Sequence, residues 1–181
     1  MHGSETGYQS EEEIRLEDQR LKEQSLKVVK LLIKEGADIN AAPGVICGRT
    51  SLQVAAIACT GRTSIELMQY LLDAGANVNA PAGSEKGVTA LQGAAIQGHI
   101  KFALMLLERN ADVNAPALRI DGRTALEGAA EHGRLDMVQL LMNVGADSHF
   151  PGRLRYRSAA KLAVEEGHVI IADILRTRFE E

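Results

Sequence analysis

The sequence has no tryptophan and few other aromatic residues: aromatic side chains make up 3% of its 181 residues, whereas hydrophobic residues make up 45%. Ala, Leu and Val must therefore fill any core, which suits closely packed short helices better than a sheet sandwich. No apolar run approaches the ~20 residues that a membrane-spanning helix needs, and the acidic N-terminus lacks the basic start and apolar centre of a signal peptide. We therefore expect a soluble intracellular protein, cytoplasmic or nuclear, without membrane contact.

Cysteine and positive charge are also scarce. The two cysteines, Cys47 and Cys59, lack Cys-x-x-Cys spacing, which favours a reducing compartment. The formal net charge is -4, and residues 1–24 hold seven acids against three bases. No broad basic surface is expected, so nucleic acid is not an expected partner, although the run Arg153–Arg157 is a local alternative.

Residues that carry chemistry are scattered. No histidine or cysteine cluster has the spacing of metal ligands, and no glycine-rich phosphate loop is present. His99 and His168 follow glycine in matching turns, which favours a structural role. We expect no cofactor, no metal and no catalytic residue, with a reactive cysteine or a ligating histidine as the alternative.

The main positive feature is an internal repeat. Residues 122–147 (GRTALEGAAEHGRLDMVQLLMNVGAD) align without a gap on residues 87–112 (GVTALQGAAIQGHIKFALMLLERNAD), and eleven of the 26 positions are identical. Weaker copies start at Gly48 and Tyr156. A fixed period in this range is typical of a stacked repeat protein. Each unit predicts a short helix, a tight turn, a longer helix and an extended loop; the second helices are expected to end at Gly36, Gly75, Asn110 and Gly145.

The unit boundaries follow from this period. Residues 1–9 are expected to be a flexible leader. Residues 10–47 are expected to be an N-terminal cap repeat with two helices, one beginning at the capping box Ser10–Glu13 and one over residues 26–34. The remaining units are the repeats 48–86, 87–121 and 122–155 and a C-terminal cap repeat, 156–181.

These motifs resemble the ankyrin repeat. Gly-x-Thr-Pro-Leu-His-x-Ala-Ala, then Gly-His and Leu-Leu-x-x-Gly-Ala-Asp-Val-Asn, is matched by GVTALQGAAIQGH with LLERNADVNA, and the Asn-Ala-Pro loops resemble fungal members of the family. The resemblance implies an all-α solenoid of about five helix-turn-helix units. The family's histidine is replaced here by Gln53, Gln92, Glu127 and Lys161, so we expect the hydrogen-bond bridge between repeats to be altered or weakened.

The resemblance also implies a non-catalytic module that binds a protein or peptide through a concave groove of first helices and loops. We expect apolar anchors at the N-terminal half and arginines that bind acidic residues at the C-terminal half. Alternatively, the loops pack inward and the arginines pair with Asp121, Glu127, Glu131 and Glu165. The candidate partner-binding residues are Val45, Ile46, Arg49, Ile57, Glu85, Lys86, Ile96, Gln97, Arg119, Asp121, Arg123, Glu131, His132, Arg155, Tyr156 and Arg157.

Two other functions stay open from the sequence. An atypical enzyme or small-molecule binder could use the cleft near Glu131, His132 and Arg123. The chain is expected to be a monomer or part of a larger chain, but imperfect end repeats could instead let it associate with itself.

Overall fold

The computed structural model describes residues 11–41, 48–58, 62–83, 87–118, 122–146 and 152–180. All regular structure within these ranges is helical, as the all-α repeat solenoid requires, and none of these helices is long and apolar enough to cross a membrane. The helices are α1 (Glu11–Lys34), α2 (Ser51–Ala58), α3 (Arg62–Asp73), α4 (Ala90–Gln97), α5 (Ile100–Glu108), α6 (Ala125–Glu131), α7 (Leu135–Asn143), α8 (Gly152–Glu165) and α9 (Val169–Glu180).

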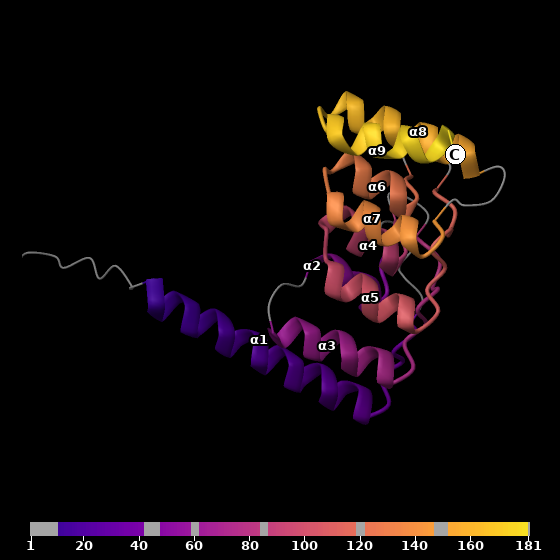
Figure 1. Cartoon of the computed structure of the whole chain (residues 1–181). Coiled ribbons are helices and arrows are strands. Elements are labelled where there is room, and N and C mark those ends of the chain that lie inside the picture. Colours follow the sequence, from indigo (N-terminus) through magenta and orange to yellow (C-terminus); the bar gives the residue numbers. More distant parts are fainter. Residues whose placement is uncertain are drawn as a thin grey trace, which may run out of the picture.

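The helices form two stacked rows (Figure 1). The first helices of the units, α2, α4, α6 and α8, pack on one another in chain order, and each contacts the second helix that follows it. Alanine pairs allow this close stacking: Ala94, Ala95, Ala129 and Ala130 are each 0% exposed.

The predicted ends of the second helices are also confirmed. Gly36, Gly75 and Gly145 have φ of 94°, 88° and 89°, and Asn110 takes the same left-handed region with φ 62°. Glycine adopts this region without a steric penalty, and asparagine tolerates it better than most residues.

Asparagines link each of these turns to the next unit. The Asn79 side chain donates to the Asn110 carbonyl at 2.9 Å and accepts from the Asp112 amide at 2.8 Å. Asn40 makes the same pair of bonds to the next turn along the chain, that of Gly75 and Asn77. Both asparagines therefore satisfy backbone groups of a neighbouring unit.

An exposed ion pair adds to these links between units. The Arg109 guanidinium on the α5 side donates to the Asp73 carboxylate at 2.6 Å. This bond, together with bonds from Gln69, holds the pKa of Asp73 below its ordinary value.

The bridge between repeats is altered, as one of the two expectations had it, and is made by glutamine. Gln92 is 2% exposed, and its Nε2 donates to the carbonyls of Ala115 at 3.1 Å and Pro116 at 3.2 Å. Its Oε1 accepts from the Thr89 amide at 2.9 Å and completes a capping box at the start of α4. Gln53 repeats the arrangement with the carbonyls of Ala80 and Pro81. The amide can donate and accept at once, so it both caps the helix and ties down the loop.

The N-terminal unit differs from the prediction. Residues 11–34 form one continuous helix, so the expectation of two helices is wrong. The segment that should have turned, Leu21–Leu26, contains no Gly or Pro, and the Ser25 hydroxyl bonds to the Leu21 carbonyl four residues earlier at 2.8 Å. The C-terminal half of α1 packs against α3, whereas its N-terminal half extends beyond the stack (Figure 1).

The first helix of the C-terminal unit also begins before the predicted boundary at residue 156. Residues 152–155 belong to α8 rather than to a projecting loop, because they continue into the helix that buries Tyr156.

Candidate functional site

The C-terminal ends of the first helices carry a row of accessible residues. The buried alanine pairs repeat from unit to unit, but the two residues that follow them are all at least partly exposed and change in chemistry along the stack. A second row, also at least partly exposed, precedes α2, α4 and α6 and continues at Arg157 within α8. We call the two rows together the first-helix face: Arg49, Ile57, Ala58, Val88, Ile96, Gln97, Arg123, Glu131, His132, Arg157, Glu165 and Glu166.

The two isoleucines of this face have a packing role. A Cβ placed on Gly93 would lie 2.5 Å from Cγ1 of Ile57, and one placed on Gly128 would lie 2.7 Å from Cγ1 of Ile96. Each isoleucine thus covers a glycine in the first helix of the next unit. Both stay partly exposed, so each also leaves apolar surface for a ligand.

Arg123 is already paired. Its Nε and Nη2 donate to the two carboxylate oxygens of Glu131 at 2.9 and 3.0 Å. The two side chains are 30% and 22% exposed. A two-bond arginine–carboxylate pair is geometrically specific. The sequence left two roles open for Arg123, partner binding and an ion pair within the chain. The structure shows the ion pair.

The other cations of the face are open to solvent. Arg49 and Arg157 are exposed and form no ion pair with residues that the structure describes. Gln97 is exposed as well, and exposed His132 places Nδ1 3.1 Å from the Gly128 carbonyl. These residues remain available for contact with a partner.

Other candidates lie elsewhere. Tyr156 is 6% exposed and its hydroxyl donates to the Ala146 carbonyl at 2.7 Å, so it is a packing residue and its assignment to the binding surface is wrong. The Arg155 side chain is not described. The remaining loop candidates lie outside the described residues: Val45, Ile46, Glu85, Lys86, Arg119 and Asp121.

The histidine of the Gly-His turn has a structural contact. His99 places Nδ1 3.0 Å from the carbonyl of Ala56, in the preceding unit, and its ring packs edge-on against Phe102 with centroids 5.3 Å apart. Within the described ranges, no group of three or more His, Cys, Asp or Glu residues could hold a metal ion.

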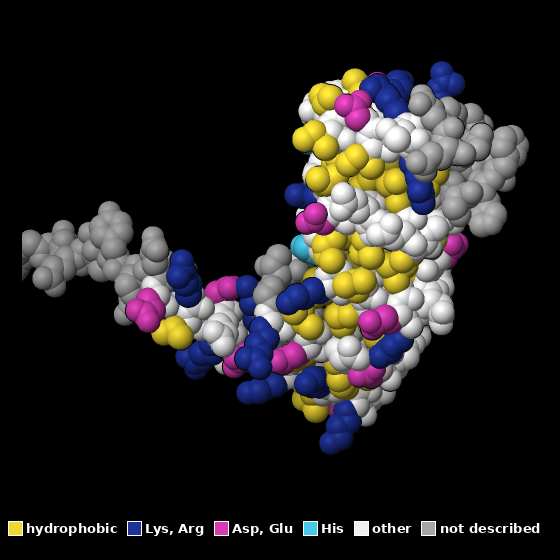
Figure 2. All heavy atoms as spheres, viewed as in Figure 1, with side chains coloured by type: hydrophobic (Ala, Val, Ile, Leu, Met, Phe, Trp, Pro, Cys, Tyr) yellow, Lys and Arg dark blue, Asp and Glu magenta, His cyan; other side chains and the backbone are white. Residues whose placement is uncertain are grey.

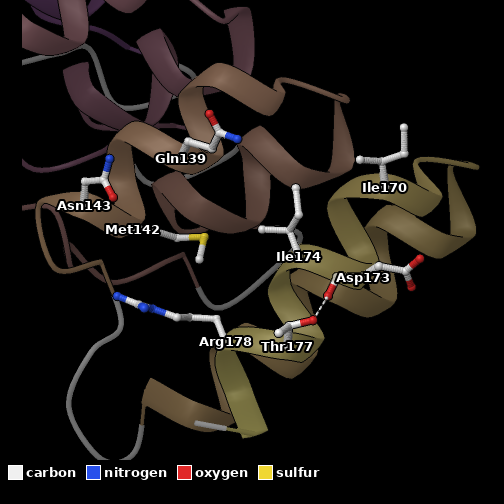
Figure 3. A pocket seen from close by; sticks show the side chains of 8 residues that line it. All are labelled: Gln139, Met142, Asn143, Ile170, Asp173, Ile174, Thr177 and Arg178. Carbon is white, nitrogen blue, oxygen red and sulfur yellow. Dashed lines mark hydrogen bonds between the residues drawn. The ribbon is translucent and has the colours of Figure 1, made fainter.

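The second helices carry an apolar surface that the sequence did not indicate. Hydrophobic side chains gather over this row (Figure 2), and a hollow of about 660 Å³ lies between α7 and α9 (Figure 3). The spacing of Ile170 and Ile174, four residues apart on α9, was the available signal. The hollow is lined by Gln139, Met142, Asn143, Ile170, Asp173, Ile174, Thr177 and Arg178.

Two stacked rows of helix pairs, tied together at a period near 35 residues, define a helical repeat protein. The chain belongs to the ankyrin repeat family: a family model of three ankyrin repeats matches residues 21–117 and, overlapping, residues 87–151. The search of curated proteins found no match. Ankyrin repeats are generally protein–protein interaction modules and are typically not catalytic.

Proposed function

We propose that this chain is a non-catalytic binding module whose first-helix face holds a segment of a partner protein. The observation that carries the proposal is the contrast within each first helix. Positions that pack are repeated, whereas the accessible positions beside them vary from Ile57 and Ile96 to Glu131 and Glu165. Variation confined to an accessible row on a fixed scaffold is typical of recognition surfaces.

The chemistry of the face suggests the kind of segment it holds. An apolar side chain fits beside Ile57 and Ile96, whose outer edges are exposed. Acidic side chains fit beside Arg49 and Arg157, because Glu131 already neutralises Arg123. The loop candidates, which lie outside the described residues, stay part of this proposal.

Rigid presentation is the proposed source of affinity. The Ala94–Ala95 and Ala129–Ala130 contacts and the Gln92 bridge hold the first helices in place before any ligand arrives. A preformed surface loses little conformational entropy on binding, so a few anchors are enough.

The charge part of the proposal is tested at Arg157. We expect a peptide selected on the immobilised wild-type chain from a displayed random library to combine an apolar residue with acidic ones. Arg157→Glu should weaken the binding of that peptide about tenfold, since it replaces attraction by repulsion at an exposed site. Affinity is measured by titration calorimetry.

Lys101→Glu is the matched control, because Lys101 is an exposed cation on second helix α5, away from the first-helix face. Circular dichroism and thermal melting confirm that both variants are folded. If the two charge reversals weakened binding equally, a nonspecific effect of charge would replace the proposed arginine contact.

A further inference from the structure

A leucine near the C-terminal end of each second helix shows that α1 lacks a neighbour. Leu71 is 1% exposed and Leu106, Leu141 and Leu175 are each 0% exposed. Leu32 has the matching position in α1, four residues before the turn glycine, yet it is 55% exposed.

A second position one turn earlier repeats the contrast. Phe102, Met137 and Ile171 are 4%, 0% and 4% exposed, whereas Val28, the matching residue of α1, is 54% exposed. In those units the second helix packs against a first helix of the same unit. No described residue forms such a helix for α1.

The exposed positions form a continuous stripe. Leu21, which is 54% exposed, lies seven residues before Val28, and Leu32 lies four residues after it. This spacing aligns all three on one side of the helix. Leu26, which is buried against the stack, lies on a different side. We call Leu21, Val28 and Leu32 the α1 stripe.

The neighbouring first helix is open on the same end of the stack. Gly93 and Gly128 lie beneath isoleucines of the preceding unit, but α2 has Val54 at this position, and Val54 is 47% exposed. Valine fits at this position of α2 because no described residue packs on Val54 in the way that Ile57 packs on Gly93.

Charge along α1 is divided between its two halves. Residues 11–22 carry five acids and three bases, and residues 23–34 carry one acid and three lysines. Two such helices laid antiparallel place the net negative half of each beside the net positive half of the other. Parallel pairing would place like charges together.

We propose that the α1 stripe binds the α1 stripe of a second copy of this chain, with the two helices antiparallel. A two-fold contact of this kind uses the same patch on both partners, and near the axis it brings Leu21 of one chain to Val28 of the other. The projecting half of α1 extends beyond its own stack and is accessible to the second copy (Figure 1). Such a dimer corresponds to the self-association that the sequence left open as an alternative to a monomer.

The first test is the mass of the full chain in solution by light scattering after size exclusion. We expect twice 19.5 kDa for the wild type. Val28→Glu and Leu32→Glu should each raise the dimer dissociation constant at least tenfold, while the fold is kept because both side chains are already more than half exposed. Leu16→Glu is the matched control: Leu16 is 62% exposed on another side of α1 and should leave the dimer intact.

The second test exchanges charges between chains. Lys27→Glu/Lys34→Glu and Glu17→Lys/Asp18→Lys should each be monomeric alone, and mixing them should restore a dimer of one chain of each kind. A monomeric wild type, equal dissociation by Leu16→Glu, or mixed variants that stay monomeric would each overturn the proposal. The peptide affinity of the first-helix face is read separately, so failure of one proposal leaves the other measurable.

Discussion

Gly122→Ala is expected to destabilise the chain by about 3 kcal/mol, the upper range for forcing extra atoms into a packed site. A Cβ at Gly122 would overlap the Leu118 amide nitrogen and lie 2.5 Å from its carbonyl oxygen and 2.7 Å from its Cα. All three are backbone atoms, so no side-chain rotation relieves the overlap. The loop that precedes α6 must open, and its displacement disturbs the first-helix face.

The measurement is the urea midpoint followed by circular dichroism, with an unchanged dependence on denaturant. Gly128→Ala is the matched control six residues away. There the added Cβ meets the side chain of Ile96 at 2.7 Å, which can shift, and alanine improves the helix propensity of α6 by about 1 kcal/mol. We expect a loss well below that of Gly122→Ala. Equal losses would contradict the assignment of the larger effect to backbone overlap.

Gln92→Glu is expected to have a comparable effect at neutral pH, about 3 kcal/mol or more. The carboxylate keeps the bond from the Thr89 amide but loses both donors to the carbonyls of Ala115 and Pro116. It also places a negative charge among oxygen atoms at a site that is 2% exposed. Burial and these carbonyls should therefore raise the pKa of the introduced carboxyl above its ordinary value.

The stability loss caused by Gln92→Glu should depend on pH. A raised pKa in the folded state means that protonation favours folding, so the penalty is small below the unfolded pKa of about 4.3. It grows as pH rises through the folded-state pKa. Denaturation midpoints of the variant and the wild type, compared across pH, should converge towards acid. A penalty independent of pH would instead indicate that shape, rather than ionisation, determines the loss.

Glu127→Gln provides the reverse control. Glu127 has the position of Gln92 in the following unit, is only partly buried, and makes the capping bond from the Thr124 amide at 2.9 Å. Glutamine keeps this bond, so little change in stability is expected at any pH.

The repeat register made most of the fold predictable. Turn residues such as Gly75 and Asn110, and the close contacts of Ala94 and Ala129, depend on local chemistry that recurs at a fixed spacing. The continuous α1 was not predictable in this way. Residues 11–34 would form two helices only if the first of them gained a packed neighbour in the stack. Without such a neighbour, local propensity favours one continuous helix, because no Gly or Pro interrupts the segment.

The sequence predicted which residues of the first-helix face are accessible, but not which of their side chains bind one another. The repeat register placed Arg123 and Glu131 on an accessible face. The sequence was equally compatible with contacts to a partner protein and with an ion pair between the two residues. Their spacing across the unit is decided by the geometry of the loop and α6. Tyr156 shows the same difficulty, since its burial depends on Ala146 and on the early start of α8.

The asparagine links have a consequence for how such a chain changes over generations. The side chains of Asn40 and Asn79 bind the turn of the next unit, and the isoleucine contacts with Gly93 and Gly128 also join neighbours. Duplication or loss of a whole unit would therefore leave every other link in place. The recognition surface could lengthen or shorten by one set of variable residues at a time, while the scaffold beneath it is copied unchanged.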